Sequence, residues 1–293
     1  MTAPSSNPQV HGIFDPATWT VTYVVHAGPG TACAIIDSVL DYDPKSGRTS
    51  HASADRVIDH VRSLDLKVEW ILETHAHADH LTGAQVLHEK TGAPIAIGAS
   101  ITGVQAFFRG IFPREDAAID GQPFDHLLQD GETWNAGSLA VHAIATPGHT
   151  PACMTYQIGD ALFTGDALFM PDQGTGRCDF PNGSAAQLFA SIQKLYALPD
   201  ATRVFVGHDY QPGGRALAFE TTIGASKSHN VQLRGDTTRD GFIASRTARD
   251  ATLAPPKLIF QSLQVNMVAG KLPPPDKNGL RYLTLPMGVL GAA

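Results

Sequence analysis

Four potential metal ligands lie within six residues of this sequence, at His75, His77, Asp79 and His80. They cannot share one face of a helix or a strand, whereas a loop can turn all four toward one point. Burying several ionisable groups together is costly unless a cation compensates them, so this cluster indicates a metal site. Isolated histidines are instead typical of surface or satisfied core positions, as we expect for His11, His51, His60, His88, His126 and His142.

Three later segments each place one more ligand directly after a predicted strand. They are Thr146-Pro-Gly-His149-Thr150, Gly165-Asp166 and Gly207-His208. Taken singly, Gly-His and Gly-Asp are common turn dipeptides with no functional meaning. Their repeated placement at strand ends favours a site that is completed by His149, Asp166 and His208.

The segments around these ligands alternate short β-rich runs with helical periods, which is typical of an α/β fold. We predict strands over 19–25, 32–37, 68–73, 139–145, 154–158, 161–163 and 203–206. We predict helices over 53–64, 81–90, 216–230, 238–250 and 257–267, the first of them capped by Ser53.

The domain organisation predicted from these patterns is a single domain over residues 1–293. Residues 99–130 contain Phe107, Phe108, Phe112-Pro113 and Phe124 but show no clear period, so we interpret them as a partly helical insertion near the site. Residues 213–293 are predicted to form a C-terminal helical extension.

Composition narrows the possible functions. The chain has 293 residues, 43% hydrophobic side chains and a net charge of −7 without a basic run, which argues against nucleic-acid binding. Its three cysteines, Cys33, Cys153 and Cys178, are odd in number and widely spaced, so we interpret them as reduced thiols and not as a disulfide framework, and we expect a cytoplasmic location. The segment Met1–Val10 lacks the features of a signal peptide, and no apolar stretch reaches the roughly 18 residues of a membrane span.

The ligands taken in order resemble the motif set of the metallo-β-lactamase superfamily. That set comprises a His-x-His-x-Asp-His motif, here His75 to His80, then a His, an Asp and a last His, here His149, Asp166 and His208. The resemblance covers residues 21–210. It implies an αββα four-layer sandwich, in which two facing sheets carry helices on their outer sides and the site lies at one sheet edge.

Several local strings look like those of the persulfide dioxygenases, also called sulfur dioxygenases. The most specific is Gly176-Arg-Cys-Asp-Phe180; the others are Thr74–Gly83, Pro147–Cys153, Thr164–Leu168, Gly207–Tyr210 and the tail Asn266–Pro275. Glyoxalase II is the nearest hydrolase relative, but its Phe-Glu-Gly and Asn-Pro-Phe-x-Arg segments are absent. Two departures from the dioxygenase pattern are Ala152, where the family often has Gly, and the insertion 99–130.

The resemblance implies one Fe(II) per chain, held by His75, His149 and Asp166 as a two-His-one-carboxylate triad with open positions. Four candidates remain, which would either bind a second metal or form a shell around the first: His77, Asp79, His80 and His208. The implied reaction uses O2 to oxidise glutathione persulfide to sulfite and glutathione. Asp79 and Tyr210 are the candidate catalytic residues.

Arg177 and Tyr210 are the candidate substrate-binding residues, and for each a purely structural role is also an open interpretation. Arg177 suits a carboxylate of glutathione or an internal ion pair with Asp179, and Tyr210 suits a hydrogen bond to substrate or a packing role. Cys153 and Cys178 suggest a thiol relay, although buried cysteines usually act as small hydrophobic residues.

Two other functions remain open on the sequence. One is a dinuclear zinc or iron thioester hydrolase of the glyoxalase II type, since all seven ligands of such an enzyme are present. The other is a catalytically silent metal-binding or sulfur-sensing protein. A homodimer is the expectation from the family.

Overall fold

The computed structural model describes residues 7–112, 114, 116 and 118–289. Residues 1–6 of the segment inspected for a signal peptide, residues 113, 115 and 117 of the predicted insertion and residues 290–293 of the predicted C-terminal extension lie outside the described residues. In the described part of the chain, no helix combines the length and the apolar character needed to cross a membrane.

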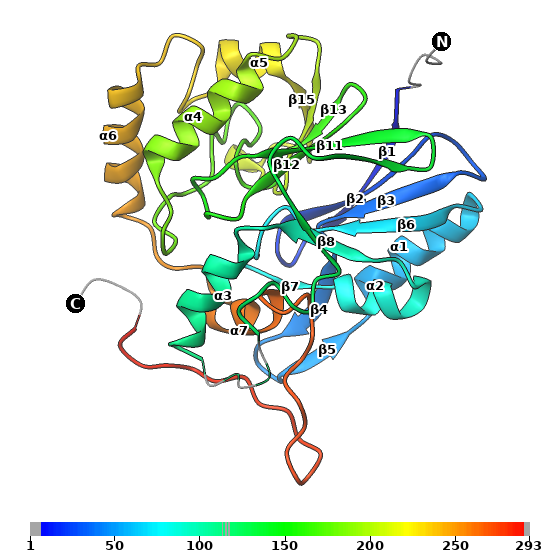
Figure 1. The fold of residues 1–293 in the computed structure, drawn as a ribbon. Coiled ribbons are helices and arrows are strands. Elements are labelled where there is room, and N and C mark those ends of the chain that lie inside the picture. Colours follow the sequence, from blue (N-terminus) through cyan, green and yellow to red (C-terminus); the bar gives the residue numbers. More distant parts are fainter. Residues whose placement is uncertain (1–6, 113, 115, 117, 290–293) are drawn as a thin grey trace.

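Two six-stranded sheets face each other (Figure 1). The first has the order β1 (Gln9–Asp15), β2 (Thr20–His26), β3 (Ala32–Ile36), β6 (Lys67–Leu72), β8 (Ile95–Gly98) and β9 (His126–Leu128). The second has the order β10 (Thr133–Ala136), β11 (Leu139–Ala145), β12 (Met154–Ile158), β13 (Ala161–Phe163), β14 (Arg203–Phe205) and β15 (Glu220–Thr222). A smaller sheet joins β5 (Arg48–Ser50), β4 (Val39–Asp43) and β7 (Leu81–Thr82).

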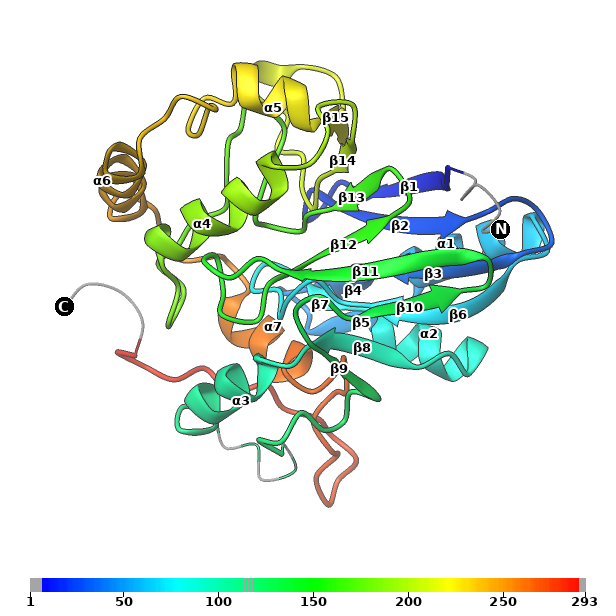
Figure 2. The same cartoon turned by 45° about the horizontal axis from the view of Figure 1, so that its top comes forward.

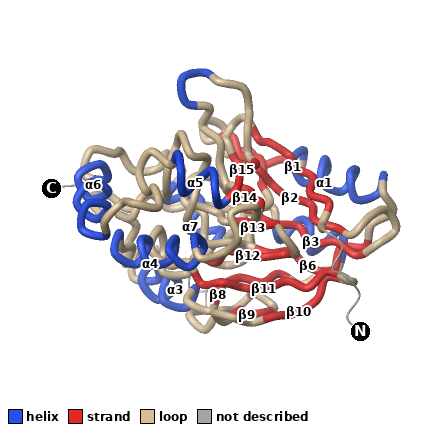
Figure 3. The backbone as a smooth tube through the Cα atoms, turned by 90° about the horizontal axis from the view of Figure 1, so that it is seen from above, coloured by secondary structure: helices blue, strands red, loops and turns tan. Residues whose placement is uncertain are grey.

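The helices cover the outer faces of the two large sheets (Figure 2). Those packed with the first sheet are α1 (Ala52–Ser63), α2 (Ala84–Thr91), α3 (Ile101–Arg109) and α7 (Ile259–Asn266). Those packed with the second sheet are α4 (Ala185–Tyr196), α5 (Ile223–His229) and α6 (Arg239–Asp250). Seen from above, the strands form the middle of the molecule and the helices its flanks (Figure 3).

Side-chain alternation along β2 explains the layering. Val21, Tyr23 and Val25 point into the core between the sheets, where they meet Val141 and other residues of the second sheet. Val24 points the other way, into the core beneath the helices. This period of two buries both faces of the sheet and confirms the αββα arrangement that the sequence predicted.

The predicted strands are all present, but two predicted helices are wrong in part. The helix expected over 81–90 begins only at Ala84, because Leu81 and Thr82 pair with β4 as strand β7. The helix expected over 216–230 is reduced to α5, because residues 220–222 pair with β14 as strand β15. In both cases pairing with a distant strand overrides the local helical pattern.

Ser53 does not cap α1, contrary to the sequence prediction. The N-cap residue is His51, and the buried Ser53 hydroxyl donates a hydrogen bond to Asp41 over 2.8 Å. The N-cap therefore lies two residues earlier than the sequence suggested, at His51 and not at Ser53.

The segment 99–130 contains α3 and β9, so its described residues are partly helical. The Gln105 side chain donates a hydrogen bond to the carbonyl of Met267 at the end of α7 over 2.9 Å. Phe108 packs against Phe180, and the Phe180 ring centroid lies 6.4 Å from that of His149. This segment thus connects α7 to the loop beside His149.

Candidate metal centre

Four loops, each following a strand, meet at one edge of the sandwich. The loop of His75 to His80 follows β6 in the first sheet, while His149 follows β11 in the second. Asp166 follows β13 and His208 follows β14, and these two strands pair in parallel. Parallel strands end at the same sheet edge, so Asp166 and His208 lie side by side.

The donor atoms form two groups, which divide the predicted residues as the sequence analysis did. Within each group all donor atoms lie within 4.8 Å of one another; the first is His75, His149 and Asp166, and the second is His77, Asp79, His80 and His208. Asp166 faces both groups, because its Oδ2 lies 3.6 Å from His149 Nε2 and its Oδ1 lies 3.3 Å from His208 Nε2.

Six buried donor atoms of these groups make no hydrogen bond in the described structure. They are His75 Nε2, His77 Nδ1, Asp79 Oδ2, His80 Nε2, Asp166 Oδ1 and His208 Nε2. Buried polar atoms are almost always paired, so six unpaired atoms in these two adjoining groups indicate a partner that the protein itself does not supply. Nitrogen and carboxylate donors at these separations fit a transition metal such as iron or zinc.

The other nitrogen of each ring is held by the protein, which orients the ring. Thr74 Oγ1 lies 3.0 Å from His75 Nδ1, and the His149 Nδ1 donates to the carbonyl of Arg177 over 2.7 Å. Burial and the neighbouring histidines lower the pKa of His75 well below its usual range, and lower that of His80 to about 4. Both rings are therefore neutral near pH 7, as metal ligands must be.

His77 is held by two buried carboxylates. Its Nε2 lies 3.1 Å from Asp37 Oδ1 and 3.5 Å from Glu73 Oε2. Burial alone would lower the pKa of His77, but the two carboxylates, Asp37 foremost, outweigh this and raise it to about 10. Burial and the nearby Asp37 raise the pKa of Glu73 to about 8.

Tyr210 and Asp79, the predicted catalytic residues, lie on the His208 side. The Tyr210 ring stacks on that of His208 with centroids 5.5 Å apart, so one part of the tyrosine is covered by the protein while the rest faces solvent. Burial of the phenol, together with the Asp79 and Asp166 carboxylates, raises the pKa of Tyr210 well above its ordinary value. The phenol of Tyr210 therefore stays protonated near pH 7 and can donate a hydrogen bond.

A cavity of about 570 Å³ opens beside His149. Its walls are mainly apolar and include Phe180 together with the loop 251–256 that follows α6. This volume is typical of small-molecule sites. Among the predicted metal ligands only His149 lines it.

Arg177 also lines this cavity, but its guanidinium is engaged within the protein. Its Nε donates to Asp179 Oδ1 over 2.5 Å, its Nη2 donates to Oδ2 over 2.6 Å, and its Nη1 donates to the carbonyl of Ala254. This geometry matches the ion pair that the sequence analysis left open as an alternative. A contact of Arg177 with substrate stays a prediction.

The cysteines are buried neutral thiols. Burial is the main cause that raises the pKa values of Cys33, Cys153 and Cys178 to about 12. A thiol relay needs a thiolate nucleophile, so this environment does not favour the relay idea.

Three residues support the site in ways that the sequence did not predict. Asp37 and Glu73 hold His77, and Asn266 holds the backbone of the His75 to His80 loop. The Asn266 amide donates to the carbonyls of His77 and His80, over 2.7 Å in each case. Asn266 was part of the tail resemblance, which was the only signal for it in the sequence.

The fold and this donor cluster define a metal-binding enzyme superfamily. The family model described as the metallo-beta-lactamase superfamily matches residues 18–208, and the chain belongs to this superfamily. The His and Asp cluster is the metal-binding cluster typical of it.

The chain is similar to several curated proteins whose names differ in activity. It is 51% identical to "Probable metallo-hydrolase" of Burkholderia pseudomallei, over 96% of this chain and 99% of that one. It is 48% identical to "Glyoxylase B2" of Dictyostelium discoideum, over 88% and 89% of the two chains. It is 29% identical to human "Persulfide dioxygenase ETHE1, mitochondrial", over 68% and 67%. Some relatives are longer, and the chain spans 65% of one from Agrobacterium fabrum.

Among solved structures, the chain is similar to ETHE1 from Myxococcus xanthus. The match has a TM-score of 0.72 and 32% identity, and it covers 90% of this chain and all of the other. The shared superfamily is therefore clear, whereas the names of the relatives include both hydrolases and a dioxygenase.

Proposed function

We propose that the protein is an iron-dependent persulfide dioxygenase that converts glutathione persulfide to sulfite and glutathione. The observation that carries this proposal is the position of the cavity. It borders the group of His75, His149 and Asp166 through His149, whereas no residue of the four-donor group lines it. A substrate in this cavity meets one centre with three protein ligands and open positions, as a non-haem iron oxygenase requires.

The iron, when bound, would supply the activation of O2 and the coordination of the terminal persulfide sulfur. His75, His149 and Asp166 would hold it on one face. Asp37, Thr74 and the Arg177 carbonyl keep the ligand rings oriented through the hydrogen bonds described above.

The stoichiometry of the reaction determines which proton transfers the remaining residues must assist. Both atoms of O2 join the terminal sulfur, one water completes the sulfite, and glutathione leaves with a proton on its own sulfur. Tyr210 is suited to donate a hydrogen bond at the centre, and Asp79 to accept a proton from water. The apolar cavity walls exclude bulk water from the persulfide.

A dinuclear thioester hydrolase is the second candidate, and one observation favours it. Asp79, His80 and His208 have unpaired donor atoms, and Asp166 directs its second oxygen at them. A second metal at this position would allow a bridging hydroxide to attack a thioester such as S-lactoylglutathione.

Metal content and oxygen uptake distinguish the two candidates. Anaerobically purified protein is expected to hold close to one iron per chain and to consume O2 when glutathione persulfide is added. Two metals per chain, hydrolysis of S-lactoylglutathione and no oxygen uptake would establish the hydrolase instead. Turnover of either substrate would exclude a catalytically silent protein.

A further inference from the structure

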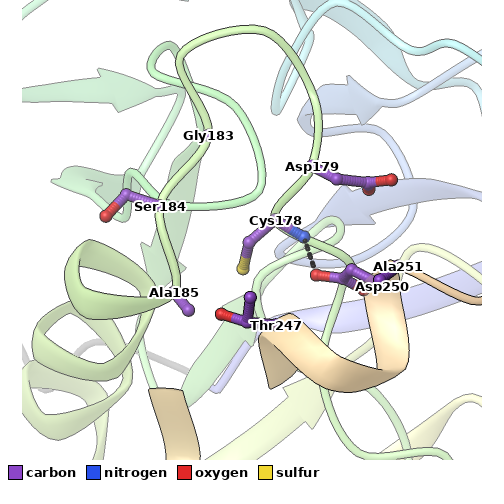
Figure 4. Close-up of a pocket in the computed structure, with 8 residues that line it drawn as sticks. All are labelled: Cys178, Asp179, Gly183, Ser184, Ala185, Thr247, Asp250 and Ala251. Atoms are coloured by element: carbon purple, nitrogen blue, oxygen red, sulfur yellow. Dashed lines mark hydrogen bonds between the residues drawn. The ribbon is translucent and has the colours of Figure 1, made fainter. Parts of the chain in front are cut away.

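A buried ion pair on α6 lies two hydrogen bonds away from His149. Arg246 is 3% exposed and Asp250 is 5% exposed, and the Arg246 Nη2 donates to Asp250 Oδ1. The other oxygen of Asp250 accepts a hydrogen bond from the backbone N–H of Cys178 over 2.8 Å (Figure 4).

The peptide group between Arg177 and Cys178 connects this ion pair to the metal centre. Its N–H donates to Asp250, and its C=O accepts the Nδ1–H of His149 over 2.7 Å. A carboxylate on the N–H side polarises the peptide group and makes its oxygen a stronger acceptor. The strengthened hydrogen bond keeps the proton of His149 on Nδ1 and leaves Nε2 free as a ligand.

The loop that carries this peptide group is anchored on both sides. The Arg246 Nη1 donates to Gln232 Oε1 over 2.8 Å, and the same oxygen accepts from the Thr175 hydroxyl over 2.9 Å. Gly176 packs closely against the backbone of Asp166, because a Cβ there would lie 1.9 Å from the Asp166 carbonyl oxygen. The loop is therefore fixed by α6 and by the strand end of Asp166.

We propose that the Arg246–Asp250 ion pair is a positioning device for His149. It sets the tautomer and the orientation of this ring from outside the metal centre, through a single peptide group. This inference rests on the proposal that His149 is a metal ligand, and it holds for either candidate reaction.

Cobalt binding to the metal-free protein tests the inference without any assay of activity. Asp250→Ala is expected to weaken Co²⁺ binding about 10–100-fold, measured by its visible absorption on titration. Asp250→Asn can still accept from the Cys178 N–H and is expected to lose less affinity than Asp250→Ala. The matched control is Arg249→Met on the same helix, where the side chain is exposed, and its affinity is expected to match that of the parent protein.

Thermal unfolding separates positioning from a purely structural role. If the ion pair positions His149, Co²⁺ raises the free energy of unfolding less in Asp250→Ala than in the parent protein. The expected difference is about 1.4–2.7 kcal/mol, which corresponds to the 10–100-fold loss of affinity. Unchanged Co²⁺ affinity in a folded Asp250→Ala protein would overturn the inference. If that variant does not fold, Arg246→Met serves as the test, because it leaves Asp250 in place but removes the cation that pairs with it. Unchanged Co²⁺ affinity in a folded Arg246→Met protein would likewise overturn the inference.

His149→Ala is measured in parallel to separate the two proposals. If His149→Ala loses Co²⁺ affinity strongly and Asp250→Ala loses none, only the positioning role is rejected. Unchanged affinity in His149→Ala would reject the proposed ligand set, and the inference with it.

Discussion

His77 differs from the other histidines of the centre in the groups that surround it. Asp37 and Glu73 both face its Nε2, and all three residues are buried. The unpaired Nδ1 belongs to the four-donor group, away from the cavity that His149 lines. In the mononuclear proposal His77 therefore supports the centre, while Asp166 holds the metal.

We predict that Asp166→Ala abolishes iron binding, whereas His77→Ala retains most of it. Asp166 offers oxygen atoms to both donor groups, while His77 contributes to the second group only. Iron content after anaerobic reconstitution measures the difference. His77→Ala is also expected to lower the free energy of unfolding by about 1–3 kcal/mol, because two buried carboxylates lose a shared partner.

The control for these variants is His142→Ala, a partly exposed site on β11 that lies outside both donor groups. It is expected to keep full iron content. Equal iron loss from Asp166→Ala and His77→Ala would mean that the ligands are wrongly divided between the two groups.

The sequence predicted the ligands well and their supporting residues poorly. The histidines and Asp166 are identifiable because they cluster or follow glycines at strand ends. Asp37 and Glu73 lie 36 positions apart and meet only because β3 and β6 pair in parallel and end together. No local pattern encodes that pairing, so neither carboxylate could be assigned to His77 from the sequence.

At the scale of elements, α7 supports the ligand loop. Asn266, at the end of this helix, donates to the carbonyls of His77 and His80 and accepts from the N–H of Thr82 over 2.8 Å. Two of these hydrogen bonds hold a loop that has no regular structure of its own, and the third holds β7 directly after it.

We predict that Asn266→Leu lowers the free energy of unfolding by about 2–4 kcal/mol and weakens metal binding. The change leaves three buried backbone groups without partners and frees the loop to move. Chemical denaturation of the metal-free protein measures the first effect and Co²⁺ titration the second. Asn278→Leu, at an exposed position, serves as the control, and equal behaviour of the two variants would contradict the prediction.

A second prediction for elements concerns β1 and α1, which are joined by stacked histidines. The rings of His11 and His60 lie 3.7 Å apart at an interplanar angle of 9°. Burial, with neighbouring histidines as a further cause, lowers the pKa of both below the ordinary 6.5. Below pH 6.5 the unfolded chain then binds more protons than the folded one, so stability falls as the pH falls.

His60→Phe keeps the stacking and removes one of these titrations. We expect the loss of Tm between pH 7.5 and pH 5.5 to be smaller in this variant than in the parent protein, as measured by calorimetry. His51→Phe, at an exposed position next to α1, is expected to leave the loss unchanged. A parent-like loss in His60→Phe would exclude the contribution of the stacked pair.

Length alone does not decide which strands could be predicted, since the three-residue β13 was predicted and the seven-residue β1, whose residues are mostly half-buried or exposed, was missed. Seven-residue β2 and β11 were predicted nearly to the residue. The three-residue strand β15 was predicted as helix, because its pairing with β14, across the loop between them, has no signal in its own sequence.

For the whole molecule, the unpaired donors imply that the metal contributes to stability. We predict that removal of bound metal by a chelator lowers the Tm by about 4 °C, as expected for a chain of 293 residues when a ligand at about 100 times its Kd is withdrawn. Calorimetry with and without chelator measures this shift. Asp166→Ala is expected to show no shift, and a shift of the parent size in that variant would contradict the role of the cluster.

The contact between Asn266 and His77 spans 189 positions of the chain. During synthesis the ligand loop leaves the ribosome long before α7 is made, and it then lacks the amide that holds its backbone. The loop is completed only when the last part of the chain has emerged. We therefore expect tight metal binding to follow the synthesis of α7, because a nascent chain arrested before Asn266 would present its histidines without the amide that holds their loop.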